Sequence, residues 1–133
     1  MAISIHPTGG AGAEILGVDL SKRISGSDLI KIKVAFAEHG LIFFRDQSLS
    51  EEQHINFAKN FGPININRFF AQHTDFPEIA MVTKEPDQTG NIGGGWHTDH
   101  SYDPEPAMGS ILLARELPPD GGDTWFLDMY KAF

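Results

Sequence analysis

Residues Trp96–Phe126 read WHTDHSYDPEPAMGSILLARELPPDGGDTWF, and this stretch decides how the rest of the chain is interpreted. In an extended segment, side chains at positions i and i+2 point to the same side. His97 and Asp99 could therefore reach one metal ion together, while Thr98 turns away. An imidazole and a carboxylate are two of the three groups of the facial triad that holds Fe(II) with positions left open. Such a triplet also arises by chance, and a hydrogen-bonded His–Asp pair at a strand end is the structural alternative.

The composition restricts the kinds of partner and metal site that the protein can have. The 133 residues suit one domain, and their formal net charge of −8 argues against nucleic acid, because phosphate binding needs a basic face. The absence of cysteine excludes disulfides, zinc–thiolate sites and iron–sulfur clusters, so His, Asp and Glu must hold any metal. No run reaches the ~18 apolar residues of a membrane span. Met1–Pro7 has no signal-peptide pattern, so we expect a cytoplasmic protein without membrane or nucleic-acid partners.

Apolar runs bounded by turn residues predict short strands along the whole chain. These strands are expected at Ile3–His6, Glu14–Val18, Leu41–Phe44, Ile79–Thr83, Gly109–Leu117 and Thr124–Leu127, with Trp96–Ser101 also extended. Helices lie among the early strands, and the later part is mainly strands. This order indicates an α+β domain with a mostly antiparallel sheet.

Capping residues mark the expected helices. The first is expected at Asp28–Glu38, with Ser27 as N-cap and Gly40 as the left-handed residue at its end. A second helix should follow Ser50, because Ser50 and Gln53 have the spacing of a capping box. Asp128 is expected to cap a third helix at the end of the chain.

Taken together, the motifs resemble the TauD/TfdA family of dioxygenases. They are the W-H-T-D box, the strand ending in A-R-E-L-P, the G-G-D-T turn, L-I-F-F-R-D-Q at Leu41–Gln47 and the F-G-P end of the second helix. The resemblance implies a double-stranded β-helix with flanking helices, a jelly roll of the clavaminate synthase-like kind. Residues 1–133 would form a single incomplete domain, the N-terminal part of that fold.

The resemblance also implies a chemistry and its residues. A non-haem Fe(II) centre would couple the decarboxylation of 2-oxoglutarate, with O2, to the hydroxylation of a small organic substrate. His97 and Asp99 fall on the family's metal positions, and Thr124 falls on its contact to the 2-oxoglutarate carboxylate. A threonine hydroxyl suits a buried carboxylate, which needs hydrogen-bond donors, although a β-branched strand residue is the alternative for Thr124. His100 should face away from both ligands, as a supporting or loop residue.

Substrate positions depart from the taurine-type pattern. Those enzymes hold a sulfonate through a His and a Tyr after the F-G turn and an Asn ahead of the W-H-T-D box. The aligned residues here are Asn67, Phe70 and Gly93, which are expected to line the substrate pocket. A sulfonate left short of donors loses affinity, so the substrate is expected not to be taurine. Packing is the alternative for Phe70.

Two family residues have no counterpart in the sequence, the distant histidine that completes the metal site and the arginine that binds 2-oxoglutarate. We therefore expect a truncated or partial form that is not a competent dioxygenase by itself and that forms a homo-oligomer through open strand edges. One alternative is a non-catalytic half jelly-roll module that assembles with another chain. Another is a different metal-dependent oxygenase or hydrolase on the same barrel.

Overall fold

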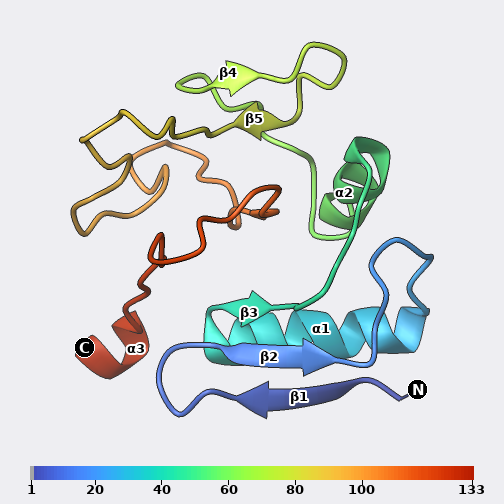
Figure 1. Cartoon of the computed structure of the whole chain (residues 1–133). Helices are drawn as coiled ribbons and strands as arrows, with labels where there is room; N and C mark the ends of the chain where they lie inside the picture. Colours follow the sequence, from blue (N-terminus) through green and yellow to red (C-terminus); the bar gives the residue numbers. More distant parts are fainter. Residues whose placement is uncertain (1) are drawn as a thin grey trace. The chain divides into compact units, whose positions relative to one another are not determined.

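The protein is seen in a computed structural model that describes residues 2–133 (Figure 1). The chain divides into two compact units. The first unit combines residues 2–54 with residues 113–133, and the second unit is residues 55–112. In sequence, the second unit is therefore an insertion within the first.

A three-stranded sheet in the order β1-β2-β3 organises the first unit (Figure 1). Strand β1 (Ser4–Pro7) pairs antiparallel with β2 (Ala13–Leu16), which places Ile5 opposite Ile15. Strand β3 (Ile42–Phe43) pairs parallel with β2. The first three predicted strands are thus confirmed in place, with bounds that differ by one to two residues.

The bend after β2 depends on a glycine. Gly17 has a φ of +79°, a left-handed conformation that side chains rarely adopt. A Cβ at this position would lie 2.6 Å from the Ala2 carbonyl oxygen, closer than real Cβ atoms come to any neighbour. Only glycine therefore lets β2 leave the sheet beside the start of the chain.

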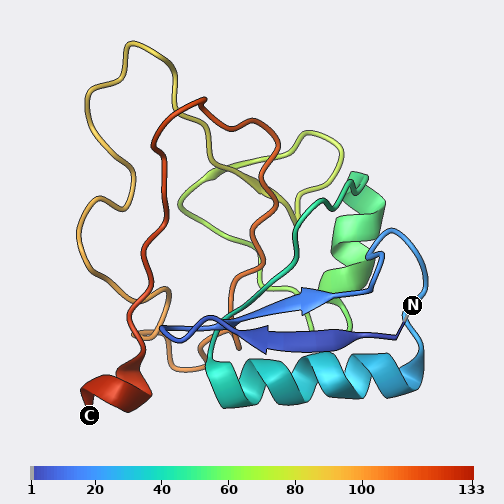
Figure 2. The same cartoon turned by 60° about the horizontal axis from the view of Figure 1, so that its bottom comes forward.

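Helix α1 (Gly26–His39) lies along one face of the sheet, as Figure 2 shows, and contacts β2 and β3. Ile32 and Ala35 of the helix are fully buried, and Ala13 and Ile15 supply the buried apolar side chains of β2. Removing this apolar surface from water stabilises the unit.

The N-cap of α1 is Ser25, so the prediction of Ser27 was wrong by two residues. The Ser25 hydroxyl accepts a hydrogen bond from the Asp28 backbone N–H at 3.1 Å. Ser27 lies within the first turn instead, with its hydroxyl 3.0 Å from that of Ser25. Both serines can cap a helix, and the sequence alone does not show which hydroxyl meets the free N–H. At the other end, Gly40 is left-handed (φ 69°) as predicted.

Helix α2 (Glu51–Ala58) begins with the predicted capping box, which is confirmed. The Gln53 side-chain oxygen accepts from the Ser50 N–H at 2.8 Å, and the Ser50 hydroxyl accepts from the Gln53 N–H at 3.2 Å. The Gln53 amide also donates to the Ser21 carbonyl at 3.1 Å. The cap therefore fixes the start of α2 against the loop before α1.

Two basic side chains, Arg115 and Lys131, link residues 113–133 to the N-terminal part of the first unit. The Arg115 guanidinium donates to the Leu49 carbonyl at 2.7 Å and to the Glu51 carboxylate at 3.0 Å. Lys131 of helix α3 (Met129–Ala132) donates to the Gly10 carbonyl at 2.9 Å. The Asp128 side chain accepts from two N–H groups of α3, which confirms the predicted cap.

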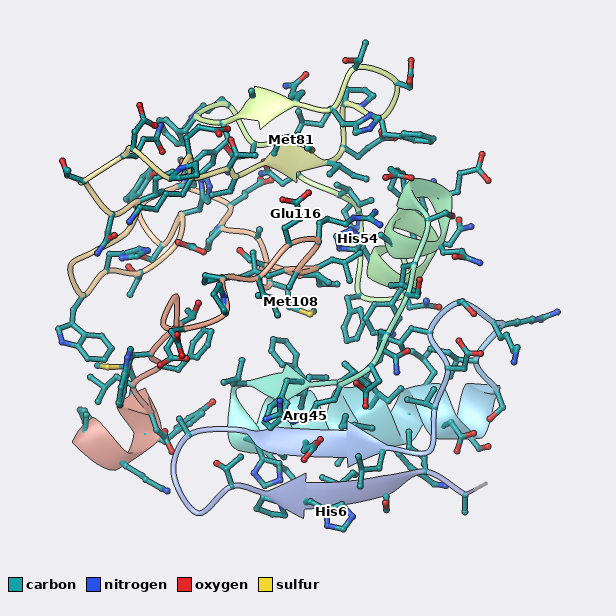
Figure 3. All side chains as sticks on the ribbon, viewed as in Figure 1. His6, Arg45, His54, Met81, Met108 and Glu116 are labelled. Atoms are coloured by element: carbon teal, nitrogen blue, oxygen red, sulfur yellow. The ribbon has the colours of Figure 1, made fainter. Side chains whose placement is uncertain are left out.

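A third basic side chain braces the sheet itself. Arg45, labelled in Figure 3, lies beside β3 and pairs with Glu14 of β2 at 3.2 Å. Its guanidinium carbon lies 5.2 Å from the centre of the Phe43 ring. The side chain is largely exposed, so the pair stabilises the parallel β2–β3 contact only slightly.

The second unit contains one small sheet. Strand β4 (Ala71–Gln72) pairs antiparallel with β5 (Ala80–Met81), and the His73 N–H donates to the Ile79 carbonyl at 2.9 Å. Strand β5 lies inside the predicted Ile79–Thr83, whereas β4 was not predicted. The remainder of this unit is mostly irregular chain with turns.

Three predicted extended segments are wrong. Trp96–Ser101, Gly109–Leu117 and Thr124–Leu127 form irregular chain and turns within the described residues. Alternating apolar residues favour a strand, but a strand exists only where a neighbour accepts its hydrogen bonds, and no segment of residues 2–133 pairs with these three. The structure is therefore α+β, as predicted, but its strands form two small sheets, and the predicted jelly roll is not directly visible.

Across residues 2–133, no helix combines the length and the apolar character needed to cross a bilayer.

Candidate metal site

His97 and Asp99 lie in the second unit, on the irregular chain that follows β5. Their side chains meet, with His97 Nε2 lying 3.4 Å from Asp99 Oδ1. The prediction placed them together on an extended strand, whereas the backbone here is a loop. Contacts specific to this loop must therefore hold the two side chains together.

The orientation of the His97 ring is set by a backbone carbonyl. Nδ1 of His97 lies 2.8 Å from the Gly95 carbonyl oxygen, which can only accept, so Nδ1 carries the proton and donates it. In the neutral ring, Nε2 is then an acceptor whose lone pair is free. That nitrogen faces the carboxylate of Asp99.

A hydroxyl orients the Asp99 carboxylate from its other side. Ser110 Oγ donates to Asp99 Oδ2 at 3.1 Å, which leaves Oδ1 facing His97. The two side chains are 57% and 60% exposed, so the pair lies at the surface of its unit. Carbonyl–histidine and hydroxyl–carboxylate contacts of this kind are typical of groups that orient metal ligands.

The pair fits a first-row metal ion. Two acceptor atoms facing each other at 3.4 Å repel unless a positive charge lies between them, either a proton on Nε2 or a metal ion. Their separation is less than twice a typical bond of about 2.1 Å, so both atoms can contact one ion. Nowhere in residues 2–133 do three or more His, Asp or Glu side chains cluster as metal ligands do. Within the described residues, His97 and Asp99 therefore form a pair that no third side chain of these kinds joins.

Gly93 lies directly against the His97 ring. It has a φ of +67°, and a Cβ built on it would lie 3.1 Å from His97 Cε1. Most real Cβ contacts are longer, so a larger residue would displace the ring. The sequence suggested Gly93 as a substrate-pocket residue, and its observed contact is with the proposed metal ligand.

Asn67 organises the turn that contains Phe70, the other two predicted pocket residues. Its side-chain oxygen accepts from the backbone N–H groups of Phe69 at 2.8 Å and Phe70 at 3.1 Å. Its side-chain nitrogen lies 3.3 Å from Nε2 of His100. The oxygen is therefore fully engaged within the turn, and the amide N–H₂ group points to the histidine.

His100 has a left-handed backbone, with a φ of 52° that is uncommon for a residue with a side chain. Such a conformation costs about 1 kcal/mol or more and persists where surrounding contacts enforce it. Nδ1 of His100 lies 3.3 Å from Asp103 Oδ2, and Asp103 in turn pairs with Arg68 at 2.9 Å. His100 is thus a loop residue, as expected, and its side chain is half-buried.

Sequence reasoning missed Arg68, Asp103 and Ser110, each of which contacts a residue of the loop or the turn. The Arg68–Asp103 pair joins residues 35 positions apart, and the Ser110–Asp99 bond joins residues 11 apart. The arginine and the aspartate are common surface residues, and nothing in the local pattern distinguishes them. Only the folded loop brings them together.

Thr124 belongs to the first unit, not to the unit that holds His97 and Asp99. It is exposed and lies in irregular chain between Gly122 and Asp128. Its predicted contact with 2-oxoglutarate therefore stays a prediction.

Comparison with known proteins gives consistent matches. The family model described as "Taurine catabolism dioxygenase TauD, TfdA family" matches residues 4–133. The alpha-ketoglutarate-dependent 2,4-dichlorophenoxyacetate dioxygenase of Cupriavidus pinatubonensis is 34% identical, over 100% of this chain and 51% of the relative. The (S)-phenoxypropionate/alpha-ketoglutarate-dioxygenase of Sphingobium herbicidovorans is 32% identical, over 92% of this chain and 43% of the relative.

Comparison with solved structures also finds alpha-ketoglutarate-dependent and taurine dioxygenases. A protein from Burkholderia xenovorans, classed provisionally as an alpha-ketoglutarate-dependent taurine dioxygenase, superposes with a TM-score of 0.64 at 32% identity, covering 75% of this chain and 37% of that one. A taurine dioxygenase from the same organism gives a TM-score of 0.52 at 34% identity, covering 56% and 28%. This chain thus spans about half the length of the curated relatives that it matches.

Proposed function

Because the chain belongs to the TauD/TfdA family, we propose that it is the N-terminal part of a non-haem Fe(II) dioxygenase. The reaction would convert 2-oxoglutarate, O2 and a small organic substrate into succinate, CO2 and the hydroxylated substrate. The observation that carries this proposal is the His97–Asp99 pair, whose Nε2 and Oδ1 atoms lie 3.4 Å apart, with each side chain oriented by a second contact.

In the proposed site, His97 Nε2 and Asp99 Oδ1 would hold the iron. With 2-oxoglutarate and O2, the bound metal would supply the oxidising chemistry. The Gly95 carbonyl keeps the His97 ring in the tautomer that leaves Nε2 free, and the Ser110 hydroxyl keeps Oδ1 of Asp99 directed to the same point. We assign to Thr124 the binding of the 2-oxoglutarate carboxylate, through its hydroxyl and its backbone N–H.

We further propose that Asn67, Phe70 and Gly93 face the organic substrate and disfavour taurine. The Asn67 oxygen is occupied by two backbone N–H groups, Phe70 offers an apolar ring and Gly93 offers no side chain. A sulfonate would meet few donors at these positions, and a buried anion without donors binds weakly. A substrate with a larger apolar part fits this set better.

The remaining parts of the site would come from outside these 133 residues. We propose that a third ligand and an arginine for 2-oxoglutarate lie in the part of the family's length that this chain does not span. That part would also complete one jelly-roll domain with residues 1–133. A cytoplasmic location and self-association through open strand edges belong to the same proposal.

Metal binding by the purified chain tests the central assignment. Mn(II), detected by the loss of its free electron paramagnetic resonance signal, should bind residues 1–133 weakly. His97→Ala and Asp99→Ala should abolish that binding, whereas His73→Ala, a histidine substitution elsewhere in the same unit, should leave it unchanged. Equal binding by all four proteins would refute the assignment of the pair as ligands.

A separate experiment tests whether residues 1–133 alone have dioxygenase activity. Residues 1–133 with Fe(II), ascorbate and 2-oxoglutarate should release little succinate, because two ligands orient the metal poorly and the arginine is lacking. Loss of a charge-assisted partner costs roughly 1.5–3 kcal/mol, or about a tenfold to hundredfold loss of binding. Sustained succinate release by a monomer would contradict this expectation. Release only by an oligomer would mean that a second chain supplies the missing groups.

A non-catalytic half-domain that assembles with another chain is the second candidate. It is favoured by the exposure of both proposed ligands and by the absence, within residues 2–133, of any cluster of three or more His, Asp or Glu side chains. A chain of this class would bind its partner with the His97→Ala substitution in place. Dependence of succinate release on His97 in an assembled complex would exclude it.

A further inference from the structure

We propose that His100 is a positioning residue that fixes the Asn67–Phe70 turn against the loop that carries His97 and Asp99. The inference rests on the proposed function only in naming the turn as the substrate side of the site. The contacts that carry it join residues 33 to 35 positions apart within the second unit.

The hydrogen bonds of Asn67 define the protonation of the His100 ring. Because the Asn67 oxygen accepts from the N–H groups of Phe69 and Phe70, its nitrogen is the atom that faces His100 Nε2. An amide nitrogen only donates, so Nε2 must accept. The ring proton is then on Nδ1, where it is donated to Asp103 at 3.3 Å. His100 is thus a bridge with one accepting and one donating nitrogen.

Further contacts strengthen the same bridge. Asp103 also pairs with Arg68, so His100 is linked to the turn directly through Asn67 and indirectly through Asp103 and Arg68. The His100 ring lies 5.7 Å from the Phe69 ring and 5.9 Å from the Tyr102 ring. The side chains of His100 and Asp103 are only 20% and 18% exposed, in contrast to the exposed ligand pair beside them.

The left-handed backbone of His100 explains how one loop can direct Asp99 to His97 and His100 to Asn67. His100 follows Asp99 directly, and its φ of 52° turns the chain immediately after the proposed ligand. An extended residue here would continue the chain in its previous direction. With the turn, Asp99 faces His97 while the next side chain faces Asn67. His100 therefore sets where Asn67 and Phe70 lie relative to the metal ligands.

The first test needs no substitution. In the ¹⁵N spectrum of the metal-free native chain, the His100 ring should show the tautomer with the proton on Nδ1. A ring with the proton on Nε2 would overturn the proposal, because Nε2 could not then accept from Asn67.

The second test separates the ring from the backbone. His100→Gly keeps the left-handed conformation and removes the ring, so the Phe69 and Phe70 amides should exchange with solvent about three to ten times faster. Asp46→Gly is the control, because Asp46 is also left-handed (φ 55°) and lies in the other unit. Unchanged exchange in His100→Gly would show that only the backbone matters and would overturn the proposal.

A third measurement distinguishes this proposal from the proposed function. Mn(II) bound at His97 and Asp99 should broaden the Asn67 side-chain amide signals in the native chain, and less so in His100→Gly at equal Mn(II) occupancy. If His100→Gly instead weakened Mn(II) binding to the extent that His97→Ala does, the ring would act on Asp99. That result would overturn the proposal that the ring positions the Asn67–Phe70 turn. Absence of Mn(II) binding to the native chain would refute the metal site, while the tautomer and exchange results would still decide the role of His100.

Discussion

Replacing Gly93 by alanine should weaken metal binding about tenfold while leaving most of the fold intact. The new Cβ would lie 3.1 Å from His97 Cε1, whereas ordinary contacts lie at 3.4–4 Å, so the ring must retreat by a few tenths of an ångström. Cε1 is bonded to Nε2, so the proposed donor atom moves by a similar amount. Binding groups must lie within about 0.5 Å of the productive geometry, so a shift of a few tenths of an ångström uses up much of that tolerance.

The backbone adds a second cost to the same substitution. Gly93 has a φ of +67°, and an L-residue in this region is disfavoured by roughly 1–2 kcal/mol. Relaxation of the loop to relieve this strain would move His97 as well. A loss of about 1.4 kcal/mol corresponds to a factor of ten in affinity.

The assay is a Mn(II) titration of the native chain and three variants, alongside urea unfolding. Gly121→Ala has the same backbone strain (φ +74°) but meets no atom within 4 Å, and Gly90→Ala has neither strain nor a close neighbour. Both controls should bind Mn(II) as the native chain does. Native affinity in Gly93→Ala would refute the idea that the position of the His97 ring matters for the metal. Weakened affinity in Gly121→Ala would show that the effect is not specific to His97.

Three other substitutions or conditions test the remaining contacts. Ser110→Ala should lower Mn(II) affinity by about tenfold without altering the urea midpoint, because it frees the Asp99 carboxylate to rotate. Ser50→Ala should reduce the free energy of unfolding by about 1 kcal/mol, since it removes half of the capping box of α2. Hydrogen bonds from Lys22 and Ser21 lower the pKa of Asp19 to about 2 from its ordinary 3.8. The ionised form therefore stabilises the native state above about pH 4, and this contribution should be lost as the pH falls through about 2, with Asp19→Asn showing a flatter profile of urea midpoint against pH.

Local chemistry made some elements predictable from the sequence. The capping box of Ser50 and Gln53 and the left-handed Gly40 require only residues a few positions apart, and both are observed. The N-cap of α1 was harder because two serines compete, and the structure selects Ser25. Predictions that depended on neighbouring residues were therefore right within about two positions.

Elements that need a distant partner were less predictable. Gly109–Leu117 has the apolar residues of a strand, yet no neighbouring strand accepts its hydrogen bonds within the described residues. Strand β4 shows the reverse case, because a weak pattern becomes a strand once β5 lies beside it. A sequence pattern reports a preference for extended backbone, and pairing depends on the rest of the fold.

The candidate site shows the same difference between features set by nearby residues and features that need distant partners. The two-residue spacing of His97 and Asp99 predicted that their side chains could meet, and they lie 3.4 Å apart. The reason given, a strand, was wrong, because the Gly95 carbonyl and the Ser110 hydroxyl hold them in a loop. The role of the pair as ligands stays a prediction, as do those of Thr124, Asn67 and Phe70.

The hydrogen bond between Arg115 and Glu51 affects how the protein can change during evolution. This bond closes a loop of 64 positions, and the whole second unit lies inside that loop. The entropy of closing a loop grows only with the logarithm of its length, so doubling the loop costs about 0.6 kcal/mol. Residues could therefore be inserted near Gly90, where a new side chain meets open space, with little penalty to the sheet and α1. The first unit can tolerate variation in the second, so the loops beside the proposed metal ligands are free to diversify.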